Sequence, residues 1–423
     1  MTLLTMKRTI LPLGVCVLLS TGCDSAQPAP RDLTFIIVGG TIIDGTGTPG
    51  VLGDVGIAGG LIAWVGESGQ ATASDTIDAT GLVIAPGFID VHSHTSPQIA
   101  QEEFKLNEGV VRQGVTTVIG GPDGYFEANT LRRLIAAHDS IGIGTNVGYY
   151  IGHNGVRRAV MGDDQKRAPT AEELDAMRAQ VREGMELGAL GLSTGLMYEP
   201  GMFGETDEVI ELAKQVEPFG GIYDSHVRNP VHAFLESDQE VITIAESAGI
   251  AGKIGHIKGV GLQNEGVIAD IIALVEAARD RGSEIVSDQY PYDGAATAEI
   301  AGIVVVPPGM AGVSTMRGLL TGQVEPTPES MTMARSEVAA AAADPAKWAA
   351  LKEASENGVD GGFAWLKATG YTSMRIVSAP ERLDIVGRYL SEIAETNGED
   401  PFRTVTDLLV EGTPINLTLG AIT

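Results

Sequence analysis

Two histidines, one residue apart, close an apolar run in the stretch PGFIDVHSHTSP, residues 86–97. The run predicts a β-strand, and side chains alternate between the two faces of a strand. Asp90, His92 and His94 therefore point the same way. Two imidazoles projecting together from the end of a strand are a natural start for a metal site.

The pattern recurs at two later strand ends. YDSHVR places Asp224, His226 and Arg228 on one face, and IGHIKG does the same for His256 and Lys258. Neutral imidazoles with oxygen ligands suit zinc, and zinc with an open position activates water near neutral pH. The chain has seven histidines, and four of them are the predicted metal ligands: His92, His94, His226 and His256.

The segments that carry these residues predict an α/β fold. After residue 86, strand-like runs alternate with segments of helical periodicity such as 171–188 and 268–282. His226 and His256 are 30 residues apart, which is the length of a βα unit. Polar residues at successive strand ends indicate a TIM-type (β/α)8 barrel with its site at that face.

The predicted division of the chain follows these patterns. Residues 34–86, with Gly-Gly turns and alternating apolar positions, predict a small antiparallel sheet. Residues 87–299 hold barrel strands one to seven, residues 300–370 form a mostly helical insertion, and residues 371–423 return toward the barrel. An eighth strand is not identified.

The N-terminus has the features of an export signal. Residues 1–22 carry Lys7 and Arg8 before an apolar run too short to span a bilayer. LSTGC resembles a bacterial lipobox, so we expect Cys23 to be lipidated, with 23–33 as a tether, and the protein to lie at the periplasmic face of a bacterial membrane. A formal charge of -27 argues against a nucleic-acid partner.

Several motifs together resemble one family. APGFIDVHSH, GVTTVIGG, VGYYIGHNGVRRAVMG, LGALGLSTGLMYEPG, GGIYDSHVRNP, HIKGVG and SDQYPY are similar to the D-aminoacylase (N-acyl-D-amino-acid deacylase) branch of the amidohydrolase superfamily. The resemblance implies a barrel with one or two zinc ions beside a small β-sandwich-like domain. It also implies hydrolysis of a linear amide in a small N-acylated amino acid by metal-activated water.

The chain departs from this family at one metal position. D-aminoacylases usually carry a zinc-ligating cysteine after the second strand, where this chain has GGPDGY. Asp123 either replaces the thiolate as an oxygen ligand or is only a turn residue after Pro122. Lys258 could be carbamylated to bridge two metals, although this branch commonly has a lysine there without that role.

Other residues have weaker claims on the substrate. Tyr290 either contacts a substrate carboxylate or only packs at the rim, and Lys258 is a further candidate contact. His153 either lines the pocket or is a packed histidine, and Arg228 either binds an anionic substrate or forms a structural ion pair. Ser193 and its neighbour Thr194 are interpreted as pocket wall.

One expected element is missing from the sequence. The family's general base is an aspartate on the eighth strand, and no matching motif precedes Thr423. We therefore expect a truncated barrel, only the N-terminal part of the β-domain, and little or no turnover by the chain as given. The alternative is a non-catalytic membrane-anchored lipoprotein that keeps a metal-binding or ligand-binding barrel.

Overall fold

The structure is a computed structural model that describes residues 33–67, 69–261, 264–292, 294–320, 324, 327–359, 364–412 and 414–420. The predicted signal, nearly all of the tether, Cys23 and Thr423 lie outside the described residues. The chain divides into two compact units, Met1–Gly87 and Phe88–Thr423. Among the described helices, none has the length and apolar character needed to cross a membrane.

The first unit is a small sheet with strand order β3-β2-β1-β4, in which β5 also pairs with β1. Its strands are β1 (Leu33–Ile42), β2 (Val51–Ala58), β3 (Leu61–Gly66), β4 (Ala73–Asp78) and β5 (Val83–Ile84). Gly59 and Gly60, with φ of 60° and 78°, form the tight turn between β2 and β3. The prediction of an antiparallel sheet was wrong in part, because β4 and β5 pair with β1 in parallel.

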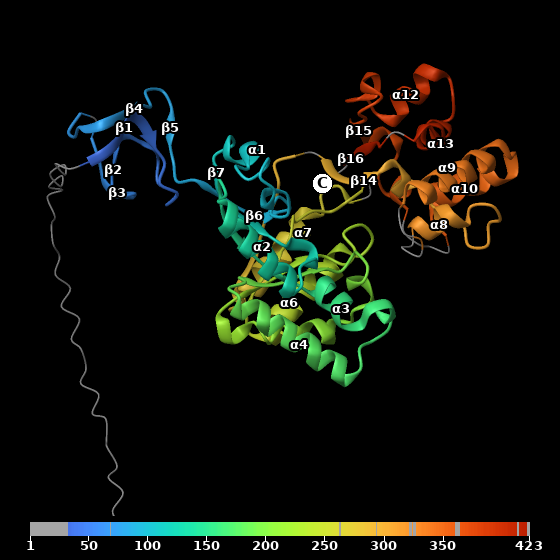
Figure 1. The fold of residues 1–423 in the computed structure, drawn as a ribbon, viewed down its shortest axis with the longest axis horizontal. Coiled ribbons are helices and arrows are strands. Elements are labelled where there is room, and N and C mark those ends of the chain that lie inside the picture. The colour runs from blue at the N-terminus through green and yellow to red at the C-terminus, as the bar shows by residue number, and fades with distance from the viewer. Residues whose placement is uncertain are drawn as a thin grey trace, which may run out of the picture. The chain divides into compact units, whose positions relative to one another are not determined.

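The second unit contains the barrel strands, which all pair in parallel (Figure 1). They are β6 (Phe88–Ser93), β7 (Val115–Gly120), β8 (Asn146–Tyr149), β9 (Ile151–Gly152), β10 (Gly191–Gly195), β11 (Ile222–His226), β12 (Ala251–Ile254) and β13 (Ile285–Ser287). The third predicted strand is interrupted at Tyr150, so it forms β8 paired with β7 and β9 paired with β10. Within the described ranges, β6 and β13 each pair with one neighbour only.

Helices connect these strands and cover a shared apolar core. They are α1 (Glu108–Val111), α2 (Ala128–Ile141), α3 (His153–Met161), α4 (Ala171–Glu186), α5 (Thr206–Ala213), α6 (Phe234–Ala248) and α7 (Ile268–Asp280). The predicted helix at 171–188 begins after a capping box between Thr170 and Glu173. Its apolar face buries Met177 and Val181 against strand residues such as Leu192 and Tyr223.

The last third of the chain forms a separate layer of helices around a three-stranded antiparallel sheet (Figure 1). The sheet has the order β14-β16-β15, with β14 (Gly294–Glu299), β15 (Met374–Ser378) and β16 (Asn416–Gly420). Its helices are α8 (Ser314–Leu320), α9 (Pro328–Ala343), α10 (Pro345–Asn357), α11 (Trp365–Thr369), α12 (Leu390–Asn397) and α13 (Pro401–Glu411). They bury a second core that includes Phe402 and Leu417.

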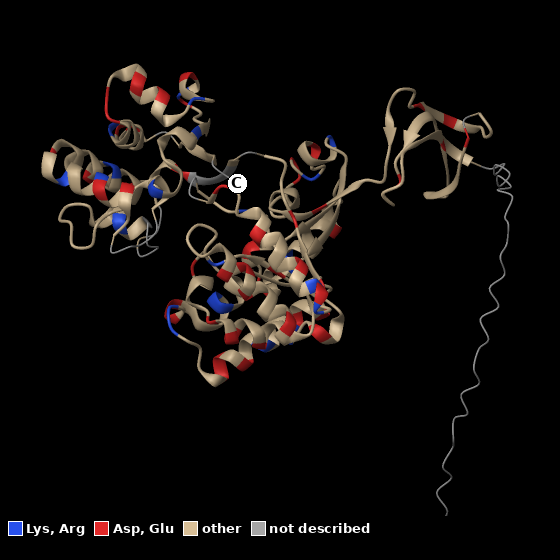
Figure 2. Cartoon of the chain, turned by 180° about the vertical axis from the view of Figure 1, so that it is seen from behind, with Lys and Arg blue, Asp and Glu red and all other residues tan. Residues whose placement is uncertain are grey.

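One boundary prediction in this region was wrong. Residues 294–299 were assigned to the barrel, but β14 pairs with β16 near the end of the chain. In the region 371–423, β15 and β16 complete this sheet, and Leu419 of β16 lines a cavity together with barrel residues such as His226. The mostly helical segment predicted for 300–370 contains separate helices, and α9 and α10 are divided because Pro345 cannot continue α9 and Asp344 caps α10. In the second unit, Phe88–Thr423, the Asp and Glu residues are spread over many helices and form no single acidic block (Figure 2).

Candidate metal centre

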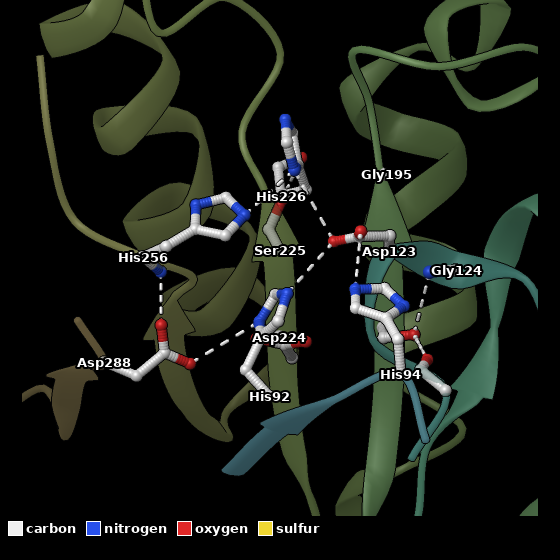
Figure 3. Close-up of polar contacts among 12 residues, drawn as sticks. His92, His94, Asp123, Gly124, Gly195, Asp224, Ser225, His226, His256 and Asp288 are labelled. Carbon is white, nitrogen blue, oxygen red and sulfur yellow. Dashed lines mark hydrogen bonds and ion pairs between the residues drawn. The ribbon is translucent and has the colours of Figure 1, made fainter. Parts of the chain in front are cut away.

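Three of the four predicted histidine ligands, His92, His94 and His226, contact the Asp123 carboxylate, and His256 lies beside His226 (Figure 3). His92 lies in β6 and His94 directly follows it, while His226 ends β11 and His256 follows β12. These positions are the carboxyl ends of parallel strands, where barrel sites form. Asp90, on the same face in the prediction, instead accepts the backbone N–H of His92 at 3.0 Å.

The contacts of Asp123 have the spacing of metal ligands. Its Oδ1 lies 3.5 Å from His92 Nε2 and 3.5 Å from His226 Nδ1, and its Oδ2 lies 3.4 Å from His94 Nε2. These distances exceed ordinary hydrogen bonds of about 2.7–3.2 Å. Two ligands of a tetrahedral zinc ion lie about 3.3 Å apart. Asp123 Oδ1 is buried without a hydrogen-bond partner, so the arrangement fits a cation shared among these side chains.

Asp123 belongs to two ligand groups at once. It joins His92 and His94 in one group and His226 and His256 in the other, with the ligand atoms of each group within 4.8 Å of one another. A carboxylate has two oxygens and can serve both groups. The residues could therefore hold one zinc ion, or two if Asp123 served both groups.

The charge states of these groups suit metal binding. Burial alone would raise the pKa of Asp123, but the facing imidazoles of His226, His94 and His92 hold that pKa well below its usual range. Burial lowers the pKa of His226 and, with repulsion from His226 and Lys258, lowers that of His256 well below normal. An ionised carboxylate beside neutral imidazoles is the form that binds zinc, and Asp123 with His226 and His256 has it. For His92, burial lowers the pKa, but the carboxylates of Asp288, Asp123 and Asp224 outweigh this and raise it.

The backbone around Asp123 explains why an aspartate in a turn can reach the cluster. Asp123 has a φ of 62° between Gly121 and Gly124, both with a φ of 79°, and aspartate tolerates this left-handed region. Ser193 holds the turn, because its hydroxyl donates to Gly121 O at 2.6 Å and accepts Gly124 N–H at 3.1 Å. Asp123 is thus a turn residue and a candidate ligand together.

A buried ionic network lies behind His92, and the sequence prediction missed its centre. The Lys253 ammonium is 2.8 Å from Asp224 Oδ1, bonds to Asp288 Oδ2 and donates to Val91 O at 3.3 Å. Asp288 Oδ2 also lies 3.6 Å from His92 Nδ1. The sequence feature that could have revealed Lys253 is its position within an apolar strand, β12, which ends at Ile254. A lysine there must be buried and needs carboxylate partners.

Asp288 acts on two ligands. Its Oδ1 accepts the backbone N–H of His256, whose φ of 40° is unusual for a residue with a side chain. Its Oδ2 faces His92, so it is placed to fix the orientation of that ring. Burial raises the pKa of Asp288, but His92 and Lys253 overcome this and hold it well below its usual range.

A cavity of about 280 Å³ opens beside the cluster. Its lining includes Lys258 and Tyr290, with the Lys258 ammonium 5.0 Å from the centre of the Tyr290 ring. Burial lowers the pKa of Lys258 to about 7 and raises that of Tyr290 to about 12. The Tyr290 hydroxyl is buried without a hydrogen-bond partner, so it is available to a ligand.

Tyr198 also lines the cavity. It belongs to the motif LGALGLSTGLMYEPG, but nothing in the sequence indicated a role for it. Its hydroxyl lies 3.4 Å from His226 Nδ1, and its ring centre lies 4.6 Å from that of His226. Burial raises the pKa of Tyr198 well above its usual value. The hydroxyl therefore stays protonated and can donate a hydrogen bond beside the metal ligands.

The structure does not bring two predicted residues to the cavity. His153 is fully buried at the start of α3, and its Nε2 is 2.7 Å from Glu208 Oε1. Arg228 donates to both carboxylate oxygens of Glu240, at 2.9 and 2.8 Å. Neither residue is among those that line the cavity. Each side chain is bound by a carboxylate, so His153 is a packed histidine and Arg228 forms a structural ion pair.

The interpretation of Ser193 and Thr194 as pocket wall was also wrong. Both side chains are fully buried within the barrel. Thr194 contacts the hydroxyls of Tyr223 and Ser225 at 2.9 and 2.8 Å, while Ser193 supports the Asp123 turn. They hold strands and a turn in place and are not among the residues that line the cavity.

Comparisons with known proteins show which proteins the chain is similar to. Residues 75–215 match the profile described as Amidohydrolase family. The chain is 33% identical over 294 residues to the D-aminoacylase of Alcaligenes xylosoxydans xylosoxydans, covering 64% of this chain and 60% of that protein. It is 34% identical over 284 residues to the N-acyl-D-glutamate deacylase of the same organism, covering 63% and 58%.

A solved structure extends the likeness to the fold. The N-acyl-D-glutamate deacylase from Bordetella bronchiseptica, complexed with zinc and a phosphonate inhibitor, matches with a TM-score of 0.67 and 28% identity, over 93% of this chain and 72% of that one. The matches to the two curated relatives span about 60% of the length of those proteins. The family resemblance seen in the sequence is confirmed: the chain carries an amidohydrolase-family domain whose sequence and fold are similar to those of the D-aminoacylases.

Proposed function

We propose that this chain binds zinc through Asp123 and the four clustered histidines and hydrolyses the amide bond of N-acyl-D-amino acids. The observation that carries the proposal is the Asp123 carboxylate, 3.4 to 3.5 Å from three imidazoles at one end of a cavity. Zinc bound there would polarise the substrate carbonyl and lower the pKa of water. The relatives' activities and the zinc in the Bordetella deacylase support this assignment.

Lys258 and Tyr290 are proposed to hold the substrate carboxylate. Among the described residues that line the cavity, Lys258 is the one lysine or arginine. The unpaired Tyr290 hydroxyl lies in the same lining and can donate a second hydrogen bond. A lysine and a tyrosine hydroxyl together suit a carboxylate next to the scissile amide. The preference for the D enantiomer rests on the relatives alone.

The proposed reaction also needs a group to move protons. Asp123 is the one carboxylate among the described lining residues, and its oxygens face the imidazoles. Asp288 is held by Lys253 and by the His256 backbone and does not line the cavity. Since general acid–base catalysis contributes about 10²- to 10⁴-fold, we expect turnover slower by that order than in an amidohydrolase with a placed base.

The test uses zinc and an isosteric variant. Purified chain is titrated with zinc by calorimetry and then assayed for amine release from N-acetyl-D- and N-acetyl-L-amino acids. Asp123→Asn should lower zinc affinity by roughly 100-fold or more. Asp280→Asn, at an exposed position, should change nothing. Equal zinc affinity for Asp123→Asn and the original chain would refute the site.

Amine release is measured separately from zinc binding, and the two results are interpreted independently. Slow, zinc-dependent release from the D compounds supports the proposed enzyme. Zinc binding with no release above that of free zinc supports the non-catalytic binding protein instead.

We also propose that the chain is exported and anchored to the membrane through lipid at Cys23. The lipobox-like LSTGC and the apolar run before it support this. Expressed with its N-terminus intact, the protein should incorporate labelled palmitate and sediment with membranes, and Cys23→Ala should abolish both. A Cys23→Ala protein that still takes up label would contradict the anchor.

A further inference from the structure

A buried histidine in α2 takes no part in the proposed chemistry. His138 lies in the last turn of that helix, and its side chain is not among the described residues that line the cavity. Its Nε2 is 2.9 Å from the backbone oxygen of Ser96, and its Nδ1 is hydrogen-bonded to the Tyr149 hydroxyl of β8. Any role of His138 at the metal centre must therefore act through these two contacts.

The two contacts fix which ring nitrogen of His138 carries the hydrogen. A backbone carbonyl only accepts hydrogen bonds, so Nε2 carries the hydrogen and donates it to Ser96 O. The lone pair of Nδ1 then accepts the hydrogen of the Tyr149 hydroxyl. Burial lowers the pKa of His138 and raises that of Tyr149, so both side chains stay uncharged near neutral pH.

The carbonyl that His138 binds belongs to the loop of a predicted metal ligand. Ser96 follows His94 by two residues and is fully buried. Its own hydroxyl has no hydrogen-bond partner, and it packs so closely on β7 that a Cβ added to Gly120 would lie 2.3 Å from Ser96 Oγ. The hydrogen bond from His138 to the Ser96 carbonyl is thus a polar anchor for this loop.

His94 depends on this loop more than the other ligands of Asp123 depend on their surroundings. Its side chain is 58% exposed, whereas those of His92 and His226 are 14% and 9% exposed. Few neighbouring atoms therefore restrict the His94 ring directly. Its direction follows from the backbone that carries it, which is held at the next residue, Thr95, by the Ser93 hydroxyl at 3.0 Å and at Ser96 by α2.

We propose that His138, kept in the Nε2–H form by Tyr149, is a positioning residue that orients His94 toward Asp123 and so sets the zinc affinity of the group formed with His92. The inference rests on the zinc site of the proposed function but not on hydrolysis. Support of a metal ligand by groups that do not touch the metal is worth about 10- to 100-fold in affinity.

Zinc titration of the full chain tests the proposal. His138→Leu removes the donor and should weaken the binding step that His94→Ala also weakens, by about 10- to 100-fold. His138→Gln can still donate to Ser96 O and should recover most of this loss. In a His94→Ala background, His138→Leu should change zinc affinity by less than about 2-fold, because its effect acts through His94. A loss of the same size in both backgrounds would indicate a general structural role and would overturn the proposal.

A pair of tyrosine variants tests the part assigned to Tyr149. Tyr149→Phe frees the His138 ring to place its hydrogen on Nδ1, so it should weaken the same zinc step by about 10-fold. Tyr371→Phe is the matched control, because it removes a hydroxyl that donates to Glu356 at 2.8 Å in the helical layer, and it should leave zinc affinity unchanged. Equal zinc affinity in the two variants would contradict the role of Tyr149. Should His138→Leu fail to fold, Tyr149→Phe still decides the proposal.

NMR of the histidine rings in the zinc-free chain tests the positioning without metal. The chain has seven histidines, and the variants His94→Ala and His138→Leu assign the two signals concerned. The ring ¹⁵N shifts of His138 should show hydrogen on Nε2. His138→Leu should shift the His94 signal and leave that of His153, which Glu208 binds, in place. An unmoved His94 signal, or hydrogen on Nδ1 of His138, would overturn the proposal.

These measurements separate the inference from the proposed function. Failure of the original chain to bind zinc would refute the proposed function, and the ring signals would still decide the role of His138. Equally tight zinc binding by the original chain and by His138→Leu would refute the inference and leave the proposed function standing.

Discussion

Lys253→Met is the perturbation that tests most directly how the metal centre is built. The Lys253 side chain is 4% exposed, and its ammonium contacts Asp224 of β11, Asp288 after β13 and the Val91 carbonyl of β6. It therefore joins β6, which belongs to the β6-β7-β8 sheet, to β11 and the end of β13 in the other barrel sheet, and β6 and β13 do not pair with each other in the described residues. Methionine keeps most of the length and removes the charge.

The cost follows from the two carboxylates left behind. The Asp224 side chain is 0% exposed and that of Asp288 is 13% exposed, so neither can recover full hydration. Breaking a buried pair by removing one partner costs about 3–5 kcal/mol of unfolding free energy. The matched control is Lys352→Met. Lys352 also contacts two carboxylates, Asp400 and Glu356, but is 28% exposed, so its loss should cost about 1 kcal/mol or less.

Urea unfolding followed by circular dichroism measures both variants, and zinc titration follows the site. Lys253→Met should also weaken zinc binding by about 10- to 100-fold, because Asp288 loses the cation that fixes it beside His92. Adding Asp224→Asn to Lys253→Met should restore at least about 1 kcal/mol, since one uncompensated charge disappears. If Lys253→Met lost no more stability than Lys352→Met and bound zinc normally, the network would have no part in holding the site.

Three further outcomes are expected. Ser193→Ala should cost about 1–3 kcal/mol in urea unfolding, because the hydroxyl satisfies two buried backbone groups of the Asp123 turn, and should lower zinc affinity measured by titration. Burial raises the pKa of Asp238 to about 7, against the attraction of Lys258, so the folded chain keeps a proton that the unfolded chain loses. The contribution of Asp238 to stability should then fall as pH rises from about 4 to 7, so the slope of unfolding free energy against pH should become more positive in Asp238→Asn and stay unchanged in Asp280→Asn. Zinc at about 100 times its Kd should add about 2.7 kcal/mol to stability, and a chelator should remove that gain in thermal scans.

The sequence was informative where the chemistry depends on local pattern. Strand periodicity located β6, β11 and β12, and metal-binding residues at the carboxyl ends of parallel strands lie near one another once those strands form one barrel, even though β6 lies in a different sheet from β11 and β12. His92, His226 and His256 were therefore predictable from residues that are far apart in the chain. The helices at 171–188 and 268–282 were predictable for the same reason, because their apolar stripes are local.

Partners that depend on packing across long separations were not predictable. His153 follows a strand as His226 ends one, yet Glu208, 55 residues later, binds His153 and takes it out of the site. Arg228 is removed from the cavity in the same way by Glu240. Both outcomes follow from where α5 and α6 place a glutamate, which the strand pattern does not specify.

The same limit explains why Lys253 was overlooked in favour of Lys258. Both lysines follow apolar residues in one short segment, and each could supply a cation to the site. β12 ends at Ile254, so Lys253 lies within the sheet and must be neutralised by carboxylates from neighbouring strands, whereas Lys258 lies in the loop and faces the cavity. The position of a strand's end, a matter of one or two residues, thus separates a lysine that supports the ligands from one that is free to meet a substrate.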